Sequence, residues 1–149
     1  IMPEGYKTVS TEVVMAAIAC GLVVDTLLVV NNFRDRDNDR EAGKRTLIVK
    51  LIDRWDEKSA LWLYLLLGYV PLAIMMGMGI HDAVVRDTST FALPLYAVYA
   101  GMHHTTYRQL KAINHGWELN RVLGSTARNI FIYGQIVFLT IVLGFALEI

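Results

Sequence analysis

The chain has 149 residues, 54% of them apolar, and its 14 Lys and Arg residues balance 14 Asp and Glu residues. Together with a positive mean hydropathy of +0.40, this composition argues against an ordinary soluble domain and favours a membrane protein. A formal net charge of zero gives no reason to expect a nucleic-acid partner. The single cysteine, Cys20, cannot form an internal disulfide.

Four apolar stretches are candidates for membrane-spanning helices, which need about 20 mostly apolar residues because their backbone amides must be paired within the bilayer. The third contains Pro94 and several polar residues, so an amphipathic core helix is its alternative. The chain begins at Ile1 and enters the first stretch without a signal-peptide pattern, which predicts a truncated chain. We expect one all-α, polytopic transmembrane bundle over residues 1–149, with helices at about 10–33, 58–80, 90–112 and 126–148.

The basic residues predict an orientation. Twelve of the 14 lie in, or directly beside, two connections at about 34–57 and 108–125. Only Lys7 and Arg86 fall on the other side of the alternating spans. The positive-inside rule therefore places both connections in the cytoplasm and the 81–90 hairpin outside. This topology is that of a multi-pass protein of the inner (cytoplasmic) membrane, with the lipid bilayer as a partner.

A polar segment, residues 31–47, follows the first apolar run without a break. If the helix continues, Asn31, Asp35 and Asp39 project from nearly the same face. Carboxylates one turn apart repel each other unless a cation lies between them. Mg²⁺ is a suitable cation because it prefers oxygen ligands and is typically held by one or two carboxylates plus substrate phosphates. Asp35 and Asp39 therefore predict a magnesium site.

Residues that can bind phosphate oxygens follow the two aspartates in the sequence. Gly43 can end the helix, and Lys44, Arg45 and Thr46 then offer an ammonium, a guanidinium and a hydroxyl to phosphate oxygens. Asp25 is an ionisable group within an apolar helix, and such groups face a cavity or a partner. These residues extend the predicted site to a magnesium–diphosphate site.

Calcium-binding and nucleotide-binding loops fit the acidic segment poorly. Asp35, Asp37 and Asp39 copy the first three ligand positions of an EF-hand loop, but Arg40 stands where that loop needs glycine and Thr46 where it needs glutamate. A Walker A loop would need an earlier glycine than the segment supplies. A solvated loop that only enforces topology remains the alternative. Four side chains that point elsewhere on the helical wheel are expected to be solvated: Arg36, Asp37, Asn38 and Glu41.

The polar segment resembles the second aspartate-rich motif of the UbiA superfamily of intramembrane prenyltransferases, within it the 1,4-dihydroxy-2-naphthoate polyprenyltransferase branch. That branch typically reads Asn-Asn-x-Arg-Asp-x-x-x-Asp-x-x-x-Gly-Lys-Arg-Thr-Leu. The matching residues are Asn31, Asn32, Arg34, Asp35, Asp39, Gly43, Lys44, Arg45, Thr46 and Leu47. Residues 116–123, followed by Thr126 and Ala127, resemble the last cytoplasmic connection of the same branch.

The resemblance implies a nine-helix, all-α fold, of which this chain supplies the last four helices. The partner N-terminal half would carry a first motif of Asn-Asp-x-x-Asp type, so the fragment alone is expected to be inactive. The implied reaction is Mg²⁺-dependent transfer from polyprenyl diphosphate to 1,4-dihydroxy-2-naphthoate with decarboxylation, giving demethylmenaquinone in menaquinone biosynthesis. The implied catalytic residues are Asp35, Asp39, Lys44 and Arg45. The expected substrate contacts are Asn31, Asn32, Arg34, Asp25, Thr46, Glu118 and Asn120.

Three alternatives remain open. Another UbiA-type enzyme with an aromatic or lipid acceptor would share the diphosphate chemistry, but the paired asparagines disfavour it. A CDP-alcohol phosphotransferase would begin its acidic motif with Asp-Gly-x-x-Ala-Arg, which is absent here. A non-catalytic transport or assembly subunit could use Asp25 and the acidic segment to bind a cation. His103, His104 and His115 lack the spacing of paired metal ligands and are expected at the membrane interface or in a loop.

Overall fold

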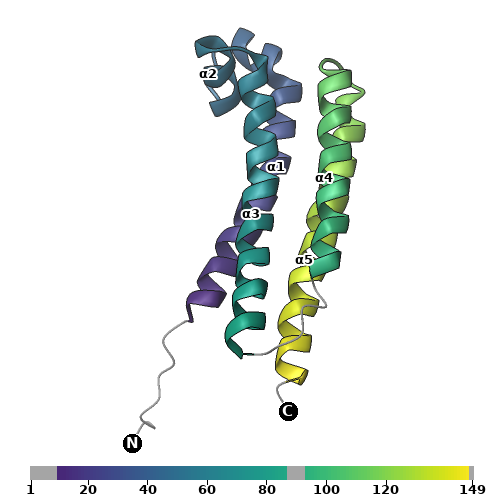
Figure 1. Ribbon diagram of the computed structural model, residues 1–149. Helices are drawn as coiled ribbons and strands as arrows, with labels where there is room; N and C mark the ends of the chain where they lie inside the picture. Colours follow the sequence, from purple (N-terminus) through teal and green to yellow (C-terminus); the bar gives the residue numbers. More distant parts are fainter. Residues whose placement is uncertain (1–9, 87–92, 148–149) are drawn as a thin grey trace, which may run out of the picture.

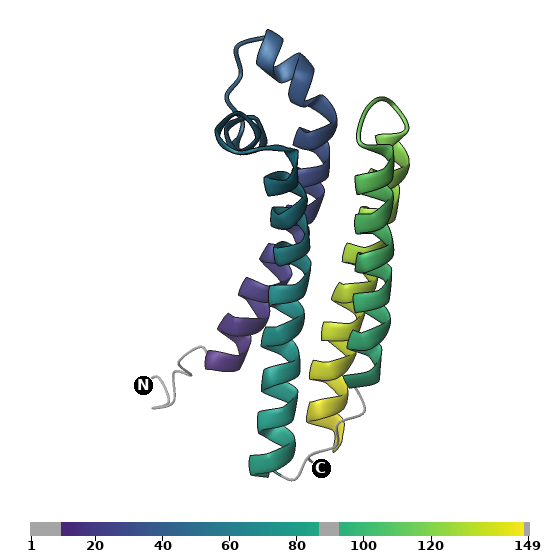
Figure 2. The same ribbon diagram turned by 45° about the horizontal axis from the view of Figure 1, so that its top comes forward.

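The structure, a computed structural model, describes residues 10–86 and 93–147, which form five α-helices and, within these ranges, no strand. The helices are α1 (Thr11–Glu41), α2 (Leu47–Arg54), α3 (Glu57–Arg86), α4 (Leu93–Ile113) and α5 (Leu119–Leu147). The four long helices run side by side, and α2 lies at one end of them (Figure 1). Figure 2 shows α2 end-on beside the upright long helices, so its axis runs across the bundle. The all-α prediction is confirmed.

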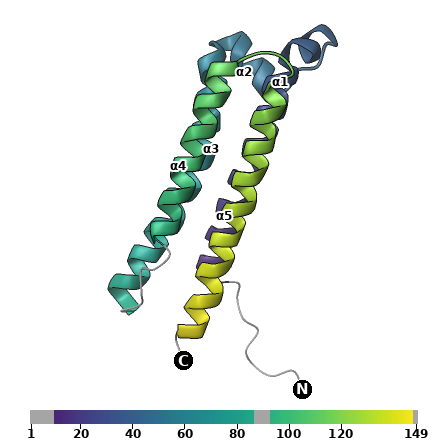
Figure 3. The same ribbon diagram turned by 90° about the vertical axis from the view of Figure 1, so that its right-hand side faces the viewer.

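The long helices pack as a ring of neighbours. α1 packs against α3 and α5, and α4 packs against the same two helices. Figure 3 shows the two pairs, with α4 in front of α3 and α5 in front of α1. One buried cluster includes Val23, Met75 and Tyr99, and a second, which α2 joins, includes Phe33 and Ile48. The second cluster supports the polar end of α1, where the predicted site lies.

Three of the described helices, α1, α3 and α5, have the length and apolar composition needed to cross a membrane, as in a multi-pass membrane protein. α4 forms as expected but is not among them, so its span stays a prediction. Both basic connections lie at the same end of the bundle (Figure 1). Which side of a membrane this end occupies also stays a prediction. Lys7, the side chain of Arg86 and residues 87–90 of the expected hairpin lie outside the described residues.

Polar side chains of α4 are buried inside the bundle, which explains its low hydropathy. The His103 ring stacks on Tyr64 with centroids 4.7 Å apart and on Tyr99 at 5.9 Å. Asn129 of α5 donates a hydrogen bond to Thr106 at 2.9 Å. Such interhelical contacts stabilise helix association where lipid provides no hydrophobic driving force. The expectation that His103 lies at the interface or in a loop is wrong, because its ring is 1% exposed.

The helices extend further than the apolar runs predicted. α1 continues to Glu41 rather than ending near residue 33, and α5 begins at Leu119 rather than near residue 126. α2 occupies much of the expected 34–57 loop, so both predicted connections are too long. Apolar runs predict which residues lie within a membrane, but not where the helix ends. Helical hydrogen bonding can continue through charged turns outside the membrane. Ion pairs within a turn, such as Arg40–Asp37 at 3.1 Å, favour that continuation.

Four polar residues hold the connection between α4 and α5 against the ends of α1 and α3. The guanidinium of Arg36 donates to the Phe33 carbonyl at 2.6 Å and to the Glu57 carboxylate at 3.1 Å. It also lies 2.7 Å from Nδ1 of His115. Asn114 donates to the second oxygen of Glu57 at 3.0 Å. We call Arg36, Glu57, Asn114 and His115 the Arg36 clasp.

The expectation that Arg36 is solvated is wrong, because its side chain is 2% exposed. A helical wheel describes α1 in isolation, whereas Glu57 of α3 and His115 of the α4–α5 connection contact Arg36 in the folded chain. A guanidinium buried in this way must keep hydrogen-bonding partners, and the clasp provides them.

Gly68 provides a test of the packing between α3 and α4 around His103. A Cβ added there would overlap the His103 ring, so Gly68→Ala should push α3 and α4 apart. We expect the free energy of unfolding of the full-length protein in detergent to fall by about 1–3 kcal/mol. Gly77→Ala on the same helix is the control, since a Cβ there meets nothing within 4 Å and should be neutral or slightly stabilising. Equal stability of the two variants would contradict this packing.

Arg36→Met tests the clasp. It leaves the Glu57 carboxylate and the Phe33 carbonyl without their guanidinium donor, so we expect a loss of about 1–3 kcal/mol of stability. Amide hydrogen exchange in residues 114–118 should accelerate. Arg40→Met is the matched control, because Arg40 is 42% exposed and its ion pairs lie at the surface, where they contribute roughly 0–1 kcal/mol. Unchanged exchange in residues 114–118 of Arg36→Met would exclude the clasp as the element that fixes this connection.

Candidate functional site

The acidic segment of α1 forms one wall of a polar cleft at the end of the bundle where α2 lies. The opposite wall comes from the α4–α5 connection and the first turn of α5. The cleft has a volume of about 450 Å³ and is lined by Arg34, Asp35, Asp37, Asn38, Gly116, Trp117 and Asn120. Three predicted site residues, Arg34, Asp35 and Asn120, therefore come together from distant parts of the chain.

The Arg34 guanidinium joins the two walls of this cleft. Its Nε and Nη2 atoms donate to the two carboxylate oxygens of Asp35, each at 2.7 Å. Nη2 also donates to the side-chain oxygen of Asn31 at 2.8 Å, and Nη1 donates to that of Asn120 at 2.9 Å. The forked pair with Asp35 is a strong, directional interaction. One side chain thus connects three predicted site residues and ties α1 to α5.

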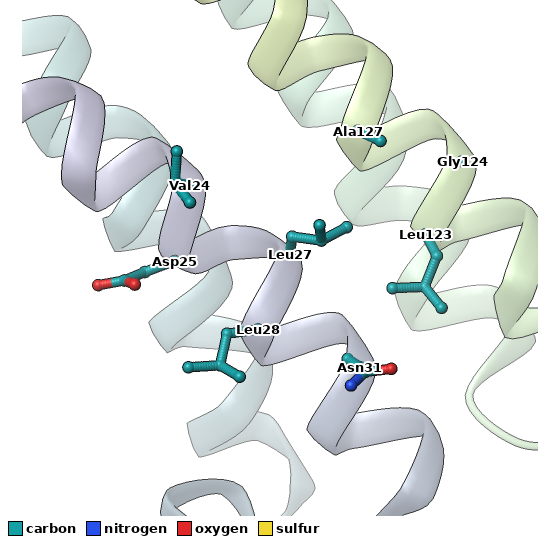
Figure 4. Close-up of a pocket in the computed structure, with 8 residues that line it drawn as sticks. All are labelled: Val24, Asp25, Leu27, Leu28, Asn31, Leu123, Gly124 and Ala127. Atoms are coloured by element: carbon teal, nitrogen blue, oxygen red, sulfur yellow. The ribbon is translucent and has the colours of Figure 1, made fainter.

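A second, mainly apolar cavity lies between α1 and α5 on the membrane side of this network. This groove has a volume of about 720 Å³ and is lined by Val24, Asp25, Leu27, Leu28, Asn31, Leu123, Gly124 and Ala127 (Figure 4). Leu27 and Asn31 point toward α5, whereas the Asp25 carboxylate projects from the other side of α1 (Figure 4). Because Asn31 lines the groove and also binds Arg34, the groove and the cleft meet at this residue.

Asp39 lies one turn beyond Asp35 and is only 8% exposed. Nζ of Lys44 is 3.3 Å from its carboxylate, and the Lys44 backbone N–H donates to the Asp39 carbonyl at 2.8 Å. Gly43 makes this return possible with φ +72°, a left-handed conformation that favours glycine, and the expected turn is confirmed. Asp35 and Asp39 are therefore each neutralised by a neighbouring cation, Arg34 and Lys44, which relieves their mutual repulsion.

The other predicted contacts lie outside the residues that line the cleft. Arg45 is exposed, and Thr46 caps α2 by accepting a hydrogen bond from the Val49 N–H at 3.3 Å. Asn32 is half-buried on α1, and Glu118 is exposed in the α4–α5 connection. Roles for these residues in substrate binding or catalysis stay predictions.

Four residues that line the cleft were not predicted from the sequence: Asp37, Asn38, Gly116 and Trp117. Asp37 and Asn38 are exposed, as expected for a solvated face, but the α4–α5 connection folds beside them. Trp117 stands next to Glu118, which was a predicted contact. The available signal for Trp117 was an aromatic residue directly after a glycine, at the start of the polar stretch 116–123.

The donor atoms at this end of α1 suit a hard cation. Within residues 10–86 and 93–147, no group of three or more His, Cys, Asp and Glu side chains is placed to hold a metal ion. Mg²⁺ does not need such a group, since substrate phosphates commonly complete its coordination. Asp35 lines the cleft and Asp39 does not, so a cation shared by their two carboxylates stays a prediction.

Comparison with known proteins gives a partial match. A segment of 44 residues is 46% identical to the 1,4-dihydroxy-2-naphthoate octaprenyltransferase of Escherichia coli (strain K12). The aligned segment covers 30% of this chain and only 14% of the length of that relative. No family model matches the chain, and no solved structure gives a significant match. Part of the chain is therefore similar to a prenyltransferase, in line with the resemblance in its sequence motifs.

Proposed function

We propose that residues 1–149 are the C-terminal part of a UbiA-type intramembrane prenyltransferase and supply the last four spanning helices of its nine-helix fold. The observation that carries the proposal is the Arg34 network, which joins an apolar groove to a polar cleft. A ligand with a long apolar tail and a charged head fits this pair of cavities. The tail occupies the groove, and the head lies beside Arg34 and Asp35. The partial similarity to a prenyltransferase supports the same substrate class.

The proposed reaction transfers a polyprenyl group from polyprenyl diphosphate to 1,4-dihydroxy-2-naphthoate. Carbon dioxide and diphosphate are released, and the product is the reduced (quinol) form of demethylmenaquinone, for menaquinone biosynthesis. Asp35 and Asp39 would hold Mg²⁺, which would supply positive charge to neutralise the diphosphate. Lys44 and Arg45 add positive charge as the carbon–oxygen bond of the donor breaks. Asn32, Thr46 and Glu118 complete the proposed substrate contacts. The first aspartate-rich motif comes from the N-terminal half of the same protein.

Arg34 has a second role in this proposal. In the structure, the two forked donors of Arg34 bind the Asp35 carboxylate. Two oxygens of a diphosphate can accept the same pair of parallel hydrogen bonds, so Arg34 can exchange part of its bonding from Asp35 to the substrate. Asp35 then has lone pairs available for the cation. Asn31 and Asn120 keep the guanidinium in place during this exchange.

The protein is proposed to reside in the inner (cytoplasmic) membrane, with the acidic segment on the cytoplasmic side. The collection of basic connections at one end of the bundle supports this orientation. A soluble, anionic acceptor would then reach the polar cleft from the cytoplasm, while the lipid-soluble donor would reach the groove from the bilayer.

Asp35→Asn and Asp39→Asn test the metal role in the full-length protein. Each substitution keeps the side-chain shape but removes a negative charge, so we expect prenyl transfer to fall by about 100-fold or more. Mg²⁺-dependent retention of prenyl diphosphate should be lost, with little change in the amount of folded protein. Glu41→Gln is the control, because this exposed carboxylate on the same helix is not a proposed ligand.

Near-normal turnover in either aspartate variant would refute the proposed metal role. Cation binding that is indifferent to prenyl diphosphate would instead support a transport subunit. Activity with a different aromatic or lipid acceptor, but not with 1,4-dihydroxy-2-naphthoate, would support the proposed diphosphate site. It would assign the protein to a different branch of the UbiA superfamily.

A further inference from the structure

The α4–α5 connection presents one large aromatic side chain to the cleft. Among the described residues, Trp117 is the only aromatic one that lines it, and it is 75% exposed. The remaining lining residues are charged or polar, apart from Gly116. The neighbouring groove, within the part of the chain that the structure describes, has no aromatic residue in its lining. The two cavities therefore differ in the kind of ligand surface they can contact.

The backbone around Trp117 is held in a defined conformation. Asn114 and Gly116 have φ values of +57° and +86°, in the left-handed region that most side chains disfavour. On the side of α4, the Arg36 clasp fixes Asn114 and His115. On the side of α5, the Asn120 side chain accepts a hydrogen bond from Arg34. Trp117 is thus exposed on a connection that is fixed at both ends.

We propose that Trp117 is the stacking platform for the aromatic acceptor, and so a specificity-determining residue of this site. The inference rests on the proposed function and deepens it. A flat, electron-rich hydroxylated ring gains offset-stacking attraction and burial against an indole. The indole gains the most from such a partner, because 75% of Trp117 is left uncovered by the described residues.

The difference between the apolar groove and the polar cleft indicates which substrate each cavity takes. An isoprenoid tail matches the groove, whose lining includes Val24, Leu28 and Leu123. An aromatic carboxylate matches the cleft, where Trp117 faces the ring and Asn38 offers an amide donor. The two substrates then meet beside Asn31 and Arg34, at the junction of the two cavities. Trp117 acts on acceptor binding and not on the diphosphate.

The test uses the full-length protein in lipid nanodiscs with Trp117→Ala and Trp117→Phe. We expect the KM for 1,4-dihydroxy-2-naphthoate, and its Kd from equilibrium binding, to rise about 3- to 10-fold in the alanine variant. The phenylalanine variant should recover most of this loss. The KM for polyprenyl diphosphate and its Mg²⁺-dependent binding should not change. Trp62→Ala is the matched control, because Trp62 is 62% exposed on α3 and does not line the cleft.

Unchanged naphthoate binding in Trp117→Ala would overturn the inference. An equal loss of donor binding would also overturn it, since Trp117 would then contact the isoprenoid. The same loss in Trp62→Ala would overturn it too, since both residues would then act only as interfacial anchors. These outcomes are distinct from failure of the proposed function, which is shown by Asp35→Asn retaining normal Mg²⁺-dependent binding of polyprenyl diphosphate.

Discussion

The polar end of the molecule depends on the forked guanidinium of Arg34. It binds Asn31 and Asp35 on its own helix and Asn120 on α5, with all four donor–acceptor distances between 2.7 and 2.9 Å. A lysine could not replace it, because an ammonium lacks the planar fork that binds a carboxylate with two parallel hydrogen bonds. This one group links the polar end of α1 to α5 and balances the charge of Asp35.

A second arginine holds the same turn of α1 from the opposite face. Side chains two residues apart on a helix project about 200° from each other, so Arg34 and Arg36 point in nearly opposite directions. Arg34 reaches α5, whereas Arg36 is buried against Glu57 of α3 and His115 of the α4–α5 connection. The two differ in exposure, with side chains 27% and 2% exposed. The half-buried Arg34 is the one to which the proposed function assigns a ligand contact, and the buried Arg36 supports the structure.

Sequence patterns were sufficient where a property is local. Apolar runs predicted the long helices, and the four-residue spacing of Asn31 and Asp35 placed both within reach of one guanidinium. Properties that depend on distant residues could not be obtained in this way. Arg34 and Asn120 are 86 positions apart, and the burial of Arg36 requires Glu57 from another helix. The same limit explains His103, whose burial between α3 and α4 no wheel of one helix can show.

The pairing of charges also determines how a cation can bind. In the described structure Asp35 is matched by Arg34, and Asp39 by Lys44, so these four groups carry no net charge. A divalent cation alone would find little excess negative charge there. In the proposed function a diphosphate would supply that charge, and its oxygens would offer Arg34 and Lys44 new partners in place of the carboxylates. Under the proposed function, the cation and the prenyl diphosphate would therefore bind as a unit, and metal occupancy would depend on the presence of the substrate.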